Sequence, residues 1–128
     1  AAIEPTIDLI TNLFRSGVAV KAYFIFGFPE ETKEEMEDTY AVARTIADAA
    51  TLMGAHFRTS VFKFRPYHGT RIYNELLASG TKVGRIAADL QLSTTSGRRQ
   101  FSFMTENCSN VDIEMLNGFI CATQEIRV

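Results

Sequence analysis

The sequence contains two copies of one short pattern, and this repetition restricts the fold more than any other feature. Each copy has an apolar, strand-like stretch, a break with proline and glycine, a threonine and a helix-like stretch. The strand-like stretches begin at Val18 and near His56, and the threonines are Thr32 and Thr70, so both intervals are 38 positions (56 − 18 and 70 − 32). Repeated strand–helix units imply parallel strands joined by crossover helices. The sequence therefore predicts an α/β fold, as a segment of a βα barrel or of an open sheet.

Hydrophobic periodicity predicts helices over residues 3–16, 33–52 and 70–79 and strands over 18–26 and 57–64. Thr32 and Glu35 match a capping box at the start of the second helix. Beyond residue 80 we expect a polar loop over 93–99, a short strand over 100–104 and a helix over about 111–127, with Ser109 and Asp112 at the spacing of a helix start. These elements suggest βα units over 1–80 and a C-terminal extension with a final helix over 81–128.

Charge and length exclude several classes of protein. A chain of 128 residues suits a single domain. The net charge of −2 provides no basic surface for nucleic acid, and no apolar stretch approaches the roughly 18–20 residues of a membrane span. We therefore expect a cytoplasmic protein without nucleic-acid or membrane partners. The two cysteines, Cys108 and Cys121, are interpreted as reduced thiols packed as small hydrophobic side chains, and no metal ligands are predicted.

The loops after the two strands are where an α/β fold would bind a ligand, because ligands bind at the carboxyl ends of parallel strands. In the first loop, Gly27 permits a turn or a close approach of a ligand, and Glu30 lies before the cap and is not explained by capping. Near the second loop stand Arg65 and His68. Lys63 is expected to point away from its neighbours Phe62 and Phe64, because side chains alternate along a strand.

These motifs resemble a known family. The stretch GVAVKAYFIFGFPEETKEEMEDTYAVARTI is similar to the fifth strand, loop and helix of radical S-adenosylmethionine enzymes, and FKFRPYHGTRIYNELLASG to their sixth strand and the segment after it. The closest likeness is to the subgroup that often carries a cobalamin-binding domain. The family pattern of glycine, isoleucine, glycine and glutamate falls on Tyr23, Ile25, Gly27 and Glu30, so its first glycine is absent.

The resemblance implies an iron–sulfur oxidoreductase or methyltransferase-type enzyme that binds S-adenosylmethionine and a [4Fe–4S] cluster, with cobalamin as a possible further cofactor. It assigns contacts with the adenine end of S-adenosylmethionine to Gly27, Phe28, Pro29, Glu30, Phe64, Arg65 and Pro66. Candidate contacts with a small-molecule substrate are Tyr23, Lys63 and His68. No catalytic residue is assigned.

The cluster itself has no site in this sequence. The family binds it through a CxxxCxxC motif, whereas here the two cysteines are 13 positions apart (121 − 108). Together with a sequence that opens on Ala1 in helical periodicity, this suggests the carboxyl half of a radical S-adenosylmethionine barrel, inactive by itself. The isolated chain is then expected to self-associate, or to cover the edge of the strand over 18–26 with its own C-terminal segment.

Two other interpretations stay open. The chain can be a self-contained α/β module that binds a nucleotide at its strand-end loops, or a non-catalytic domain whose apolar strand surface docks a partner. The first predicts tight nucleotide binding by this chain alone, and the second predicts a stable complex without a ligand.

Overall fold

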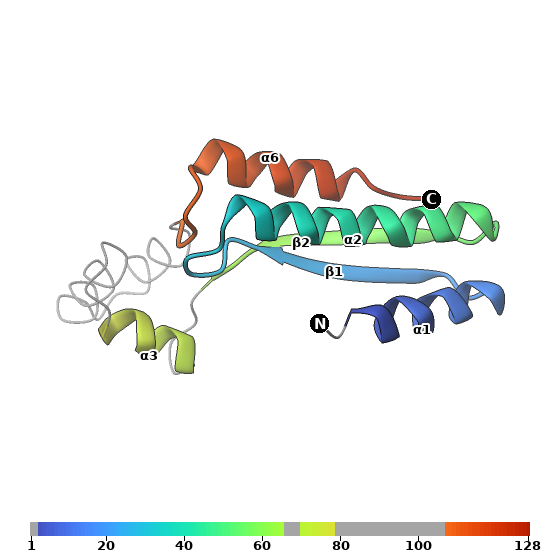
Figure 1. Ribbon diagram of the computed structural model, residues 1–128, viewed down its shortest axis with the longest axis horizontal. Coiled ribbons are helices and arrows are strands. Elements are labelled where there is room, and N and C mark those ends of the chain that lie inside the picture. The colour runs from blue at the N-terminus through green and yellow to red at the C-terminus, as the bar shows by residue number, and fades with distance from the viewer. Residues whose placement is uncertain (1–2, 66–69, 79–106) are drawn as a thin grey trace, which may run out of the picture.

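The computed structural model describes residues 3–65, 70–78 and 107–128, and within them the protein is a mixed α/β structure (Figure 1). The elements are α1 (Glu4–Arg15), β1 (Val20–Phe26), α2 (Lys33–Leu52), β2 (Phe57–Lys63), α3 (Arg71–Ala78) and α6 (Ile113–Gln124). The predicted order of elements is confirmed up to α3. The final helix is confirmed but shorter than expected, while the loop and strand predicted over 93–104 lie outside the described residues.

The two strands form a parallel sheet, as the repeated units predicted. Their register pairs Val20 with Phe57 and Phe26 with Lys63, so paired residues are 37 positions apart. The crossover between them runs through α2, which is the usual way to connect parallel strands. Among the described residues the sheet has these two strands only.

The sheet has one face covered by helices and one face open. On the covered face, Phe26 and Phe57 are fully buried and belong to cores that also contain side chains from α1, α2 and α6. On the open face, Tyr23, Ile25 and Phe62 expose 66%, 44% and 52% of their surface. Because successive side chains of a strand point to opposite faces, the strands supply both surfaces from alternate residues.

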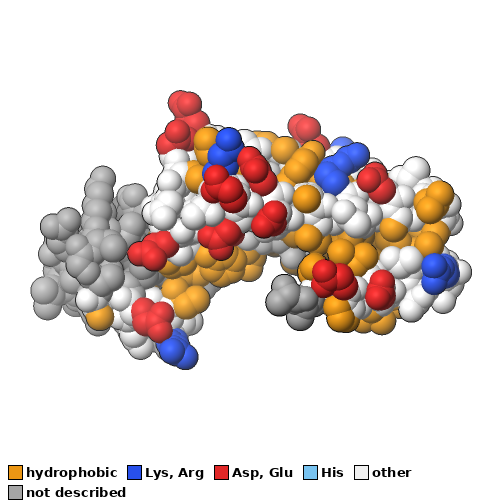
Figure 2. All heavy atoms as spheres, in the orientation of Figure 1, with side chains coloured by type: hydrophobic (Ala, Val, Ile, Leu, Met, Phe, Trp, Pro, Cys, Tyr) orange, Lys and Arg blue, Asp and Glu red, His pale blue; other side chains and the backbone are white. Residues whose placement is uncertain are grey.

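Helix α2 lies across the covered face between α1 and α6 (Figure 1). Its alanines Ala43, Ala47 and Ala50 are buried, and small side chains allow the helix to approach the strands and α1 closely. Asp and Glu side chains gather over the amino-terminal half of its outward surface (Figure 2). This charged surface opposite an alanine stripe is the pattern expected of a helix with one buried side.

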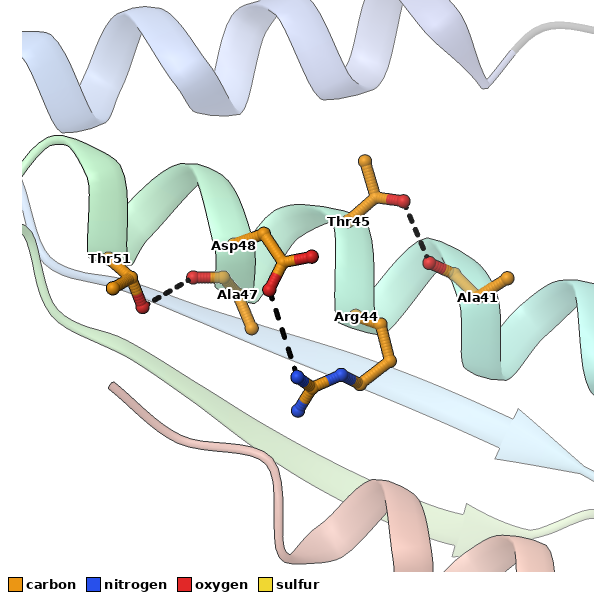
Figure 3. A network of polar contacts seen from close by, with 6 residues as sticks. All are labelled: Ala41, Arg44, Thr45, Ala47, Asp48 and Thr51. Carbon is orange, nitrogen blue, oxygen red and sulfur yellow. Dashed lines mark hydrogen bonds and ion pairs between the residues drawn. The ribbon is translucent and has the colours of Figure 1, made fainter.

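Local hydrogen bonds fix the ends and the outer surface of α2. The capping box is confirmed, since the Thr32 hydroxyl accepts from the Glu35 amide and the Glu35 carboxylate accepts from the Thr32 amide. Further along, Thr45 and Thr51 donate to carbonyls four residues earlier, and Arg44 lies 3.7 Å from Asp48 (Figure 3). These contacts satisfy polar groups locally and leave the apolar stripe to the core.

The C-terminal residues lie along the edge of β2. Phe57 and Val128 exchange two backbone hydrogen bonds of 3.1 and 2.8 Å, and Arg58 forms an antiparallel bridge with Arg127. Farther along β2, the Val61 amide donates to the side-chain oxygen of Gln124. Among the described residues, the C-terminal segment therefore covers the edge of β2. Whether the edge of β1 is covered, as the sequence suggested, stays a prediction, because residues 79–106 lie outside the described part of the chain.

Two other expectations concern the C-terminal region: the start of the final helix and the environment of the cysteines. The final helix begins after Asp112, whose carboxylate accepts from the Met115 amide, whereas Ser109 bonds to Asn107. Both cysteines are free, but Cys121 is exposed, so its assignment as a packed hydrophobic side chain is wrong. None of the described helices is both long and apolar enough to cross a membrane.

Candidate functional site

A cavity of about 540 Å³ lies at the carboxyl ends of both strands. Its described walls come from three parts of the chain: the end of β1 with the loop after it, the end of β2 with the two residues after it, and the start of α3. The lining residues are Ile25, Phe28, Phe62, Lys63, Phe64, Arg65, Thr70 and Ile72. The cavity thus sits where parallel α/β proteins bind their ligands.

Aromatic rings and basic groups dominate the lining. The rings of Phe28 and Phe64 lie with centroids 5.0 Å apart and planes tilted by 37°, within the usual range for attractive aromatic pairs. Phe64 is buried, whereas Phe28 is half-exposed and presents ring surface to the cavity. Lys63 and Arg65 add two positive charges, and none of the lining residues that the structure describes carries a carboxylate. Such a lining suits a flat ring with hydrogen-bond acceptors along its edge.

The loop after β1 is closed by a carboxylate that the sequence did not single out. The side chain of Glu31 accepts a 2.7 Å hydrogen bond from the amide of Gly27, four residues earlier. Gly27 has a φ of +94°, and a Cβ placed there would lie 3.4 Å from two atoms of Leu116. The positive φ therefore favours glycine at this turn, while an added Cβ would stand in ordinary van der Waals contact with Leu116 of α6. Gly27 does not line the cavity.

Glu30, in the same loop, has an unusual backbone conformation. Its φ is +62°, in the left-handed region that residues other than glycine seldom adopt. The loop is tied to the segment before α6, because Glu30 donates from its amide to the Cys108 carbonyl and Asn110 donates from its amide to the Glu31 carbonyl. The side-chain amide of Asn110 also donates to the Glu30 carbonyl. These bonds connect the shape of the loop to the C-terminal segment.

The structure brings together only some of the residues predicted for the site. Four of them line the cavity: Phe28, Lys63, Phe64 and Arg65. Gly27, Pro29 and Glu30 belong to the adjoining loop but do not line it. Pro66 and His68 lie outside the described residues.

Tyr23 and Lys63, two predicted substrate contacts, occupy different parts of the sheet. Tyr23 is on the open face outside the cavity, with its ring stacked on Phe62 at 6.0 Å and the Lys21 ammonium 5.4 Å from its centroid. Lys63 pairs with Phe26 in the register, on the face opposite Phe62, as alternation predicted. Its side chain passes Gly27 and still reaches the cavity at the end of the strand.

Four residues of the lining were not predicted: Ile25, Phe62, Thr70 and Ile72. Ile25 and Phe62 face each other in the strand register, so alternation identifies them once the open face is known. Thr70 was expected only as a helix cap, and its hydroxyl does accept from the Tyr73 amide. No local signal in the sequence places Thr70 and Ile72 against the strand ends.

No metal centre is found in the part of the chain that the structure describes: no three or more His, Cys, Asp and Glu side chains there are grouped to bind a metal ion. Comparison with known proteins adds no assignment, because no family model matches the chain and no solved structure is significantly similar to it.

Proposed function

We propose that this chain is the carboxyl part of a radical S-adenosylmethionine-type barrel, and that the cavity at its strand ends receives the adenine end of S-adenosylmethionine. The observation that carries the proposal is the position and lining of the cavity. Three residues that the family resemblance assigns to the cofactor, Phe28, Phe64 and Arg65, and one candidate substrate contact, Lys63, lie around one apolar space.

The one-sided cover of the sheet supports a barrel origin. In a βα barrel, helices cover the outer face of the strands and the inner face is filled by side chains from the other strands. Here α1, α2 and α6 cover one face, while Tyr23 and Phe62 stand open on the other. Two parallel strands with an exposed apolar face, as found among the described residues, are what a separated barrel segment would have.

The residues of the cavity suit adenine. Phe28 offers ring surface for stacking, and the Thr70 side chain and the basic Lys63 and Arg65 supply polar groups at the edge of the space. When bound, S-adenosylmethionine would supply the adenosyl group used for hydrogen abstraction in the family that the sequence resembles. The role of this chain would be to orient the adenine and keep water from its face.

The residues of this chain do not fit a [4Fe–4S] cluster. Cys121 is exposed on α6, and Cys108 lies in the segment that hydrogen-bonds to the loop containing Glu30. We therefore assign no cluster ligand and no cobalamin contact here. Reading the codons that precede Ala1 in the gene tests this part of the proposal: a CxxxCxxC motif upstream supports it, whereas a start codon directly before Ala1 contradicts it.

An NMR titration tests the cavity. With ¹⁵N-labelled chain and S-adenosylmethionine, we expect amide shifts at Phe28, Phe64, Arg65 and Thr70, with weak affinity because only one end of the cofactor is held. The Phe28→Ala variant should bind about fivefold or more weakly, since stacking of a base on an aromatic side chain contributes roughly 1–3 kcal/mol.

Tyr23→Ala is the matched control, because it removes an exposed aromatic ring of β1 that lies outside the cavity. Shifts that avoid the cavity, or equal losses in both variants, contradict the proposed site. Micromolar affinity for S-adenosylmethionine or ATP would instead identify a self-contained nucleotide-binding module.

The exposed apolar surface supports a second candidate function, that of a docking domain. Tyr23, Ile25 and Phe62 form a contiguous apolar surface across the two strands. Surfaces of this kind are found at protein–protein contacts as well as at ligand sites. This alternative requires a stable complex that forms through these three side chains without any nucleotide.

A further inference from the structure

Three basic residues stand side by side across the sheet at the end far from the cavity. Lys21 pairs with Arg58 in the parallel register, and Arg58 in turn pairs with Arg127 in the antiparallel bridge. Residues directly opposite each other on neighbouring strands point to the same face. Lys21, Arg58 and Arg127 therefore form a row of three cations, called here the cation row, on the open face.

The backbone holds two of these cations especially close. Because Phe57 and Val128 exchange both of their backbone hydrogen bonds, the next pair, Arg58 and Arg127, is a non-hydrogen-bonded pair. In such pairs the Cα atoms are only about 4.5 Å apart and the side chains approach more closely than in the alternate pairs. Like charges placed directly opposite each other repel, so this arrangement is unfavourable without an anion.

The surroundings of the cation row do not neutralise it. None of the three residues takes part in an ion pair among the described parts of the chain, where the ion pairs belong to Lys33, Arg44 and Arg71. The Lys21 ammonium lies over the Tyr23 ring, which leaves its charge uncompensated. Glu125 also lines the space beside the row, so three positive charges face one carboxylate there.

A polar hollow of about 380 Å³ adjoins the cation row. Ser60 and Gln124 line it together with the row. The side-chain oxygen of Gln124 is held by the Val61 amide, which leaves its NH₂ group as the donor of that side chain. Cations, a hydroxyl and an amide donor around one hollow are the groups that recognise phosphate or carboxylate oxygens.

From this geometry we propose that the cation row is a binding site for a compact anion with two or more negative charges, such as a phosphate-bearing or multiply carboxylated small molecule. Arg58 and Arg127 provide guanidinium donors that suit oxyanions, and Lys21 contributes a third charge. The site lies at the amino-terminal end of β1 and the cavity at its carboxyl end. It does not depend on the proposed binding of S-adenosylmethionine.

NMR titrations of the full chain at constant ionic strength test the site, with pyrophosphate, citrate and chloride as probes. We expect saturable amide shifts at Lys21, Arg58, Gln124 and Arg127 with at least one of the two polyanions and none with chloride. A stronger response to pyrophosphate indicates a phosphate ligand, and a stronger response to citrate indicates a carboxylate ligand. The absence of saturable shifts with both polyanions overturns the proposal.

Single substitutions identify the residues responsible. Arg58→Gln and Arg127→Gln should each weaken binding by roughly threefold to tenfold, the effect of losing one charge-assisted hydrogen bond. The matched control is Arg44→Gln, which removes an exposed arginine that pairs with Asp48 on the other side of the molecule. Equal weakening by the control variant overturns the site, since it would show only an effect of net charge.

A charge reversal at Arg127 provides a further test, with the unfolding temperature as a second measurement. Arg127→Glu places a carboxylate opposite Arg58 in the same close pair, so it should abolish polyanion binding and raise the unfolding temperature at low salt. Adding pyrophosphate should raise the unfolding temperature of the unmodified chain but not of this variant. An Arg127→Glu chain that still binds the polyanion contradicts the proposed site.

Discussion

The two faces of the β1–β2 sheet come from alternate residues of the same strands, yet one is a core and the other is open. Phe26 and Phe57 on the covered face have no exposed surface, whereas Tyr23 and Phe62 on the open face expose more than half of theirs. Aromatic side chains of similar size thus end in opposite environments. The difference shows that the sequence of a strand predicts which side chains are apolar, whereas the packing of the helices decides which of them become buried.

The largest expected effect separates the two faces by stability. Phe57→Ala should destabilise the chain by about 3–5 kcal/mol, because it empties a fully buried site against Phe14. Phe62→Ala should cost less than about 1 kcal/mol, since that ring is half in solvent already. Urea denaturation followed by circular dichroism measures both losses. A Phe57→Ala chain that does not fold at all would also show the expected large loss of stability. Equal losses would show that the open face is not open in solution.

The Gly27→Ala variant tests the turn that follows β1. Gly27→Ala should cost about 1–3 kcal/mol, because its φ of +94° is strained for any residue with a Cβ. The control is Gly118→Ala in α6, where nothing lies within 4 Å of an added Cβ and alanine should stabilise the helix by about 0.5–1 kcal/mol. Opposite signs in the two urea titrations are expected. A neutral Gly27→Ala change would show that the turn does not require glycine.

Two buried threonines sharpen the comparison within the covered face. The Thr59 hydroxyl donates to the carbonyls of Thr123 and Ile126, at 2.8 and 3.2 Å. The Thr123 hydroxyl is buried without a partner in the described structure. Thr59→Val should therefore cost about 1–2 kcal/mol, while Thr123→Val should be neutral or stabilise by up to about 1 kcal/mol. Thermal unfolding of both variants decides, and a larger loss for Thr123→Val would indicate an undescribed partner for its hydroxyl.

The smallest change in stability is expected on the open face, where the readout is association. The double variant Tyr23→Ser with Phe62→Ser should alter the free energy of unfolding by less than about 1 kcal/mol but reduce self-association. Leu52→Ser is the control, since Leu52 is an exposed apolar residue at the end of α2. Sedimentation velocity over a concentration series measures the effect. A chain that remains monomeric before any substitution would contradict the expected self-association.

The order and type of the elements were predictable because they depend on short-range signals. The helical stripe before Gly17, the alternation in both strands and the Thr32–Glu35 capping box each need only a few neighbouring residues. The parallel pairing followed from the repeat. What the sequence could not supply was the docking of α6, because its contacts with the strands join residues far apart in the chain.

The residues of the candidate site also fall into those named from the sequence and those seen only in the structure. Phe28, Phe64 and Arg65 were assigned through the family resemblance, and Lys63 was a candidate substrate contact at the end of the second strand; all four line the cavity. Ile72 became visible only in three dimensions, because its nearness to the strand ends depends on the path of the chain into α3. Glu31 was overlooked because the sequence shows a row of carboxylates, and only the turn at Gly27 selects the one that bonds back to the loop.

The pairing of Val128 with Phe57 also has a consequence for the order of events during folding. The β1–β2 register joins residues 37 positions apart, whereas this edge contact joins residues 71 positions apart (128 − 57). Contacts between more distant residues require larger loops to close and tend to form later. A chain on its way to the native state should therefore pass through an intermediate stage in which β2 has already paired with β1 while its outer edge is still unprotected.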